Sequence, residues 1–199
     1  EEVADTIRDG TFGMVSETMG FIDEVVSVAA SDGCGLGAAT GKMLIERKAP
    51  NRDQSIFVAA LQAGIPATVH VAIGTDTVHV SSGLDAASLG TATMHDFRLI
   101  CDVVSDLGVG PGGDVGGVWL NVGSAVLLPE VFLKAVSVAR NFGADLDLMT
   151  TANFDMLRHY RPHANVVTRP VAAGRGFEIV GHHEIMLPLL RQAVIEALA

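Results

Sequence analysis

Cysteine, aromatic residues and positive charge are all scarce in this 199-residue chain. It has two cysteines, one tryptophan and one tyrosine, and its 13 Lys and Arg face 23 Asp and Glu, for a formal net charge of −10. Nucleic acid and anionic membranes repel so acidic a chain, so neither partner is expected. Cys34 and Cys101 lack metal-type spacing, which indicates a reduced, cytoplasmic protein.

Long hydrophobic runs are also missing, although 49% of the residues are hydrophobic. No run approaches the ~20 apolar residues that a membrane span needs. The apolar content therefore predicts an extensive core or a subunit interface, and we expect a homo-oligomer. The chain opens on Glu1 without an initiator methionine or signal peptide, so we expect an amino-terminal truncation.

The pattern of apolar residues changes along the chain. Up to about Gly64 it is helical, with helices expected over 14–30, 36–47 and 53–63. After that point strands, over 67–73, 118–122, 146–151 and 177–180, alternate with helices over 92–107, from about Pro129, and over 184–198. This alternation predicts a single α/β domain, 1–199, with a Rossmann-like three-layer core over 51–199 and a mostly parallel sheet, preceded by a helical segment over 1–50.

Polar residues follow each expected strand. Ligands bind at the carboxyl ends of the strands in open α/β sheets, so we expect these residues to share one site. We assign acid and base roles to Asp76, His79 and His182. Cofactor binding is assigned to Gly123, Ser124, Thr151, Asn153 and Asp155, and substrate binding to Asp85, Arg158, His183 and Glu184.

Several of these residues have a second interpretation. Gly123 and Ser124 suit a phosphate or carboxylate at a helix start, or equally a tight turn with a capping serine. Arg158 opens a basic segment over 158–163 that suits an anionic ligand or the acidic surface of a neighbouring subunit. His70, Asp76 and His79, with His182 or His183, could also form the centre of a metal-dependent hydrolase or lyase, but their spacing fits no ligand motif and no metal is assigned.

Four short motifs resemble those of a known family from about residue 51 onward. They are Gly64-Ile65-Pro66 with the later Thr75-Asp76, then Asp96-Phe97-Arg98-Leu99-Ile100, Thr151-Ala152-Asn153-Phe154-Asp155 and Leu187-Pro188-Leu189-Leu190. In this order and spacing they resemble the carboxyl-terminal part of deoxyhypusine synthase. The resemblance implies a Rossmann-like fold, NAD as cofactor, and transfer of an aminobutyl group from spermidine to a protein lysine.

The departures from the family pattern bear on activity. The loop after the strand over 118–122 carries a catalytic lysine in the family, whereas Leu127 and Leu128 stand in this loop. Basic residues over 158–159 and 182–183 replace acidic ones, which favours an anionic ligand over a polyamine. We therefore expect a divergent, transferase-like member that binds NAD or another anionic small molecule without synthase activity. A non-catalytic binding or assembly protein is the further alternative.

Overall fold

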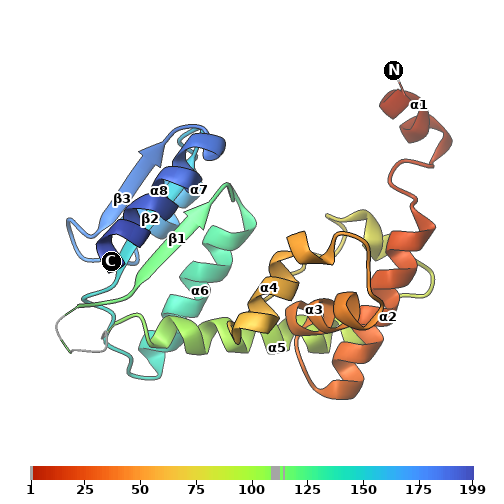
Figure 1. The fold of residues 1–199 in the computed structure, drawn as a ribbon, viewed down its shortest axis with the longest axis horizontal. Helices are drawn as coiled ribbons and strands as arrows, with labels where there is room; N and C mark the ends of the chain where they lie inside the picture. The colour runs from red at the N-terminus through yellow and green to blue at the C-terminus, as the bar shows by residue number, and fades with distance from the viewer. Residues whose placement is uncertain (1, 109–112, 114) are drawn as a thin grey trace. The chain divides into compact units, whose positions relative to one another are not determined.

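The computed structural model describes residues 2–108, 113 and 115–199. They form two compact units, Glu1–Leu99 and Ile100–Ala199 (Figure 1). The boundary between the units follows Leu99. The single domain over 1–199, with a helical segment over 1–50, stays a prediction. None of the helices within the described ranges is long and apolar enough to cross a membrane.

The first unit is helical. It contains α1 (Glu2–Asp9), α2 (Ser16–Asp32), α3 (Leu36–Glu46), α4 (Ile56–Ala63) and most of α5 (Ala86–Ser105), with 3₁₀ turns η1 (Arg52–Gln54) and η2 (Thr77–Val80). The helices expected over 14–30, 36–47 and 53–63 are confirmed with ends shifted by a few residues. α5 begins six residues before its expected start at residue 92.

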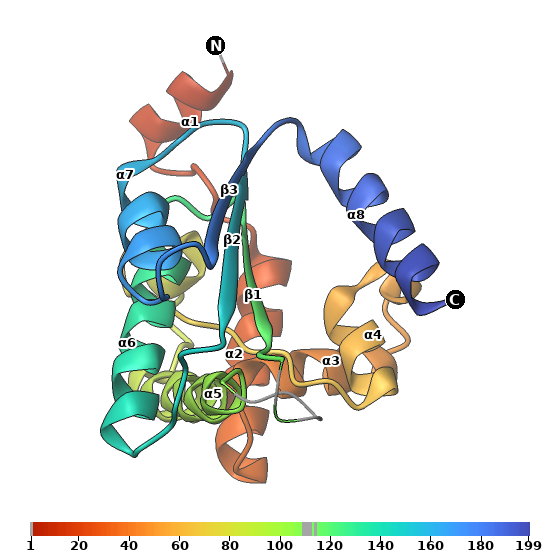
Figure 2. The same ribbon diagram turned by 90° about the vertical axis from the view of Figure 1, so that its left-hand side faces the viewer.

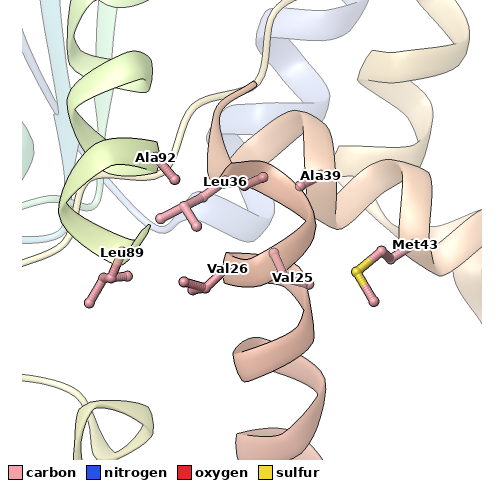
Figure 3. Packing of buried hydrophobic residues seen from close by; sticks show 8 residues of the cluster. Val25, Val26, Leu36, Ala39, Met43, Leu89 and Ala92 are labelled. Atoms are coloured by element: carbon pink, nitrogen blue, oxygen red, sulfur yellow. The ribbon is translucent and has the colours of Figure 1, made fainter. Parts of the chain in front are cut away.

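The core of this unit lies where α2, α3 and α5 meet (Figure 3). Val25 and Val26 of α2 are almost wholly buried, and Leu36 of α3 and Leu89 of α5 are 4% and 3% exposed. Each such side chain contributes roughly 1.5–3 kcal/mol through burial. Packing between helices therefore stabilises this unit, without a sheet among its described residues.

The prediction of a strand over 67–73 is wrong. The segment forms no strand and pairs with no other strand among the described residues. Its backbone bonds instead with side chains of α5: the Val69 N–H donates to Asp96 Oδ2 at 2.9 Å, and the Val71 N–H donates to Thr93 Oγ1 at 3.2 Å. The Thr93 hydroxyl in turn donates to the Val69 carbonyl at 3.1 Å. One helix thus satisfies the polar groups that a neighbouring strand would otherwise satisfy.

The second unit holds a parallel three-stranded sheet in the order β1-β2-β3. Its strands are β1 (Val118–Val122), β2 (Thr150–Asp155) and β3 (Gly176–Val180). The α/β class and the strands expected over 118–122 and 177–180 are confirmed. The strand expected over 146–151 is misplaced, because Leu146 and Met149 are buried within the turn that precedes β2. Thr151, Asn153 and Asp155 therefore lie inside a strand rather than after its end.

Figure 2 shows α6 (Leu127–Asn141) and α8 (His183–Leu198) on opposite sides of this sheet. The α8 side stays open, since α8 buries none of its residues and Leu120 and Ile179 of the sheet are 41% and 39% exposed. On the α6 face, Trp119 of β1 stacks on Phe132 with ring centroids 4.3 Å apart. The same face is covered by α7 (Tyr160–Pro162) and by the π-helix η3 (His163–Thr168), where the Thr151 hydroxyl donates to the Val166 carbonyl at 2.6 Å.

Candidate functional site

A row of polar side chains crosses the α6 face of the sheet. Asn121, Asn153 and Glu178 are register neighbours on β1, β2 and β3, so their side chains point to the same face. Asn121 Nδ2 donates to Asn153 Oδ1 at 2.7 Å, and Asn153 Nδ2 donates to Glu178 Oε1 at 3.2 Å. The two asparagines are 2% and 1% exposed, and hydrogen bonds in such surroundings are strong. This polar row holds the Glu178 carboxylate in one orientation.

The polar row ends at a histidine that reaches solvent. His163, the first residue of η3, places its Nδ1 2.8 Å from Glu178 Oε2. The Glu178 side chain is 10% exposed and the His163 side chain 56% exposed. Since a carboxylate only accepts hydrogen bonds, the imidazole donates through Nδ1–H. The neutral ring therefore carries its lone pair on Nε2.

This pair lies in a hollow of about 360 Å³, here called the basic hollow, which is lined by Arg158, His159, Tyr160, His163 and Glu178. Arg158 and His159 follow the carboxyl end of β2 by a few residues, and Glu178 comes from β3. Tyr160 is 74% exposed. No hydrogen bond or ion pair joins Arg158 to another residue in the part of the chain that the structure describes.

Neighbouring cations are already paired. Glu130 of α6 accepts a hydrogen bond from Asn165 Nδ2 at 2.8 Å and lies 3.5 Å from Arg161 Nε. Arg169 donates to Asn165 Oδ1 at 2.8 Å and to the Tyr160 hydroxyl at 3.3 Å. These bonds tie η3 and α7 to α6. They leave Arg158 as the arginine of the basic hollow that is available to a ligand.

The predicted turn after β1 is present and connects β1 to α6 through defined hydrogen bonds. Gly123 has φ +65°, and its N–H donates to the Phe154 carbonyl at 2.9 Å. Ser124 Oγ accepts from the Leu128 N–H at 3.2 Å in the first turn of α6, although the N-cap residue itself is Val126. Asn121 Nδ2 also donates to the Ser124 carbonyl at 2.9 Å, which links this turn to the polar row.

Residues at the start of α8 lie beside the same turn. A Cβ at Gly123 would lie 3.3 Å from His183 Nε2, so the imidazole packs over the glycine. His183 Nδ1 is buried without a hydrogen-bond partner among the described residues. His182 is the exposed N-cap residue of α8, and Glu184 lies in its first turn, where a negative charge is favourable.

Two buried residues of β2 have structural bonds. Asp155, 8% exposed, accepts through Oδ1 from the Leu157 N–H at 3.3 Å. Thr151 is wholly buried and its hydroxyl is used by η3. Of the five predicted cofactor residues, Asn153 is the one whose side chain leads to the basic hollow.

Asp76, His79 and Asp85 belong to the first unit, whereas His182 belongs to the second. Asp76 is exposed, and His79 Nδ1 accepts from the Gly74 N–H at 3.2 Å. Asp85 Oδ2 accepts from the Ser88 N–H at 2.9 Å in the first turn of α5, and hydrogen bonds from Ser88 lower the pKa of Asp85. The strand that was expected to deliver these residues is absent, and the acid and base roles assigned to them stay predictions.

The first unit also contains a buried carboxylate to which the sequence assigned no functional role. Asp96 is wholly buried and accepts through Oδ2 from the N–H groups of Val69 and Gly37. Burial raises the pKa of Asp96 despite these bonds, and its Oδ1 has no partner among the described residues. Burial also lowers the pKa of nearby His70, whose Nε2 lies 3.0 Å from Thr68 Oγ1. The Asp96 carboxylate thus supports the segment over 67–73.

No metal-binding group is present in the described part of the chain, where no three His, Cys, Asp or Glu side chains lie close enough to hold an ion. The set proposed for a metal-dependent enzyme therefore gains no support from the geometry. The chain matches no protein-family model, and no curated protein or solved structure is significantly similar to it. The likeness to deoxyhypusine synthase thus depends on the quoted sequence motifs alone.

Proposed function

We propose that this protein binds NAD or another small anionic molecule in the basic hollow. The observation that carries the proposal is the unpaired Arg158, which lies with His159 and an exposed Tyr160 just beyond the carboxyl end of β2. Such strand ends are the usual ligand-binding positions of parallel α/β sheets. The proposed site therefore uses residues of the second unit alone.

The lining of the hollow suits the parts of a nucleotide. A guanidinium binds phosphate or carboxylate oxygens through two parallel hydrogen bonds, and an uncommitted one does so without first breaking an ion pair. The exposed ring of Tyr160 offers a flat apolar surface for a base.

The sequence motifs support the same ligand class. Their likeness to an NAD-dependent family favours NAD among the anionic candidates. Leu127 and Leu128, which stand in the loop that carries the family's lysine, argue against synthase activity. Assembly into a homo-oligomer and a cytoplasmic location belong to the proposal as predictions from composition.

Calorimetric titration with NAD, ADP-ribose, AMP and inorganic phosphate tests the proposal. Arg158→Ala should weaken binding by about tenfold or more, because a hydrogen bond to a charged group contributes roughly 1.5–3 kcal/mol. Arg191→Ala removes an exposed arginine of α8, outside the hollow, and should leave the affinity unchanged. Lack of binding by the wild-type chain, or equal losses in the two variants, would contradict the proposal.

A further inference from the structure

The histidine and glutamate of the basic hollow form a pair that ligand binding alone does not require. Glu178 accepts from His163 Nδ1 at 2.8 Å and from Asn153 Nδ2 at 3.2 Å, so both of its oxygens are engaged. Asn153 is held in turn by Asn121. A carboxylate fixed in this way orients the ring, and the ring leaves Nε2 without a hydrogen bond to any described residue.

An oriented imidazole with a free nitrogen is the arrangement that proton transfer needs. A base held by a third group is a recurring feature of hydrolytic sites, since it fixes both tautomer and direction. His163 is 56% exposed, so its Nε2 can reach water and a ligand together. Arg158 in the same hollow supplies a positive charge for an anionic reacting group.

We propose that the basic hollow hydrolyses phosphate esters, with His163 as the catalytic residue and Glu178 as its positioning residue. This activity rests on the proposed function, because it uses the same hollow to hold the anionic ligand. Asn153 and Asn121 act through Glu178 and are positioning residues as well.

The reaction consumes one water and needs no further reactant. The water oxygen forms a bond to phosphorus while the bond from phosphorus to the ester oxygen breaks. A proton of the water passes to His163 Nε2, and the departing ester oxygen takes a proton from that nitrogen. The products are an alcohol and a phosphate with one ester bond fewer, and no atom changes oxidation state.

Arg158 explains why a phosphate ester is preferred to a neutral ester. Negative charge on the phosphoryl oxygens is present in the substrate and shifts during the transfer, and a guanidinium stabilises it through two hydrogen bonds. His159 lines the same hollow and lies one helical turn before His163, whose N–H donates to the His159 carbonyl at 3.2 Å. The Glu178 charge is directed at His163 and Asn153.

The test uses the full chain with p-nitrophenyl phosphate, bis(p-nitrophenyl) phosphate and 2′,3′-cyclic AMP as probes. The wild type should hydrolyse at least one of them, and His163→Asn should lower kcat by about a hundredfold or more, the usual scale of general acid–base catalysis. Added imidazole should restore part of that rate. His95→Asn, which removes an exposed imidazole of α5, should have no effect.

Glu178→Gln separates positioning from folding. Its kcat should fall by about tenfold with KM little changed, since an amide orients the ring less strongly than a carboxylate. The ¹⁵N NMR spectrum of His163 should show the Nδ1–H form in the wild type and a mixture of tautomers in this variant. A purely structural glutamate would lower thermal stability without altering the tautomer.

AMP binding, measured on the same samples, keeps the two proposals distinguishable. Hydrolysis of none of the three probes, or equal rates in the wild type and His163→Asn, would overturn the catalytic role. If AMP still bound in that case, the binding function would stand. A wild type that binds no AMP, NAD or phosphate would overturn the proposed function itself.

Discussion

The two units of the molecule both bury polar side chains, but they use them differently. In the first unit, Asp96 bonds to the backbone of Val69 and Gly37, so its hydrogen bonds stay inside the protein. In the second unit, the polar row passes from Asn121 through Asn153 and Glu178 to an exposed histidine. The first network thus stays within the protein interior, whereas the second reaches solvent at His163, where we propose the site.

The comparison is tested most strongly by removing the Asp96 carboxylate. Asp96→Ala removes the acceptor of the buried Gly37 N–H and of the half-buried Val69 N–H, at about 1–3 kcal/mol each. Urea unfolding should show a loss of about 2–6 kcal/mol, and Asp96→Asn, which keeps one acceptor oxygen, should lose less. If Asp96→Ala lowered the free energy of unfolding no more than a substitution at an exposed site does, the carboxylate would not stabilise the first unit.

Substitution of Gly35, which lies beside Asp96, should have the next largest effect on stability. A Cβ at Gly35 would collide with Asp96 Oδ1 and Cγ, and the carboxylate cannot move away without losing its backbone donors. Gly35→Ala should destabilise the protein by about 1–3 kcal/mol, as overpacking does.

Gly90→Ala on α5 is the matched control for that glycine, because the new methyl group would meet no atom within 4 Å apart from its own neighbours and the backbone of its own helix. It should stabilise the protein by about 0.5–1 kcal/mol through helix propensity. Similar effects of the two substitutions in thermal unfolding would show that crowding around Asp96 is unimportant.

The second unit should respond differently to loss of its central polar residue. Asn153→Ala removes one donor to Glu178 and the acceptor of Asn121, which still bonds to the Ser124 carbonyl. We expect a loss of about 1–2 kcal/mol in stability, together with a change in the tautomer of His163. Asn141→Ala, at an exposed site on α6, should change neither. An unchanged ¹⁵N NMR signal of His163 would show that the polar row does not orient the histidine of the basic hollow.

The smallest expected effect is a change in how the free energy of unfolding depends on pH. The pKa of Asp96 is raised by burial above its ordinary value of 3.8, so the folded protein holds its proton more tightly than the unfolded chain. The Asp96 contribution to stability is therefore greatest below pH 3.8 and declines as pH rises through the folded pKa. Relative to Asp96→Asn, the wild type should lose stability over that interval in urea unfolding at a series of pH values. A constant difference would contradict the raised pKa.

The helices and the two strands β1 and β3 follow from local patterns. The helical pattern of the first 64 residues predicted α2 and α3. The run over 67–73 has the composition of a strand, yet its hydrogen-bond partners are Asp96 and Thr93 of a helix. Local composition indicates an extended backbone, but it does not say what pairs with that backbone.

The candidate site was predictable only in part. Arg158 was identified because it is a basic residue in an acidic chain, and the structure places it in the basic hollow. Glu178 was missed because it lies within a strand, and His163 was included only as part of the basic segment over 158–163, without a role of its own. The two are 15 residues apart, and only the fold brings them together. The alternation of side chains along β3 carried the available signal, because it places Glu178 on the same face as any polar residue in register on β2.

The sequence alone determined the acidic charge, the alternation of strands and helices in the second half, and the basic segment after β2, because these depend on residues close together in the chain. Only the tertiary structure decided that the run over 67–73 bonds to a helix. It also decided that Asn121, Asn153, Glu178 and His163 form one hydrogen-bonded line. Both outcomes depend on register and packing between distant segments. The free energy of such contacts depends on which groups are brought together, and no local pattern encodes that choice.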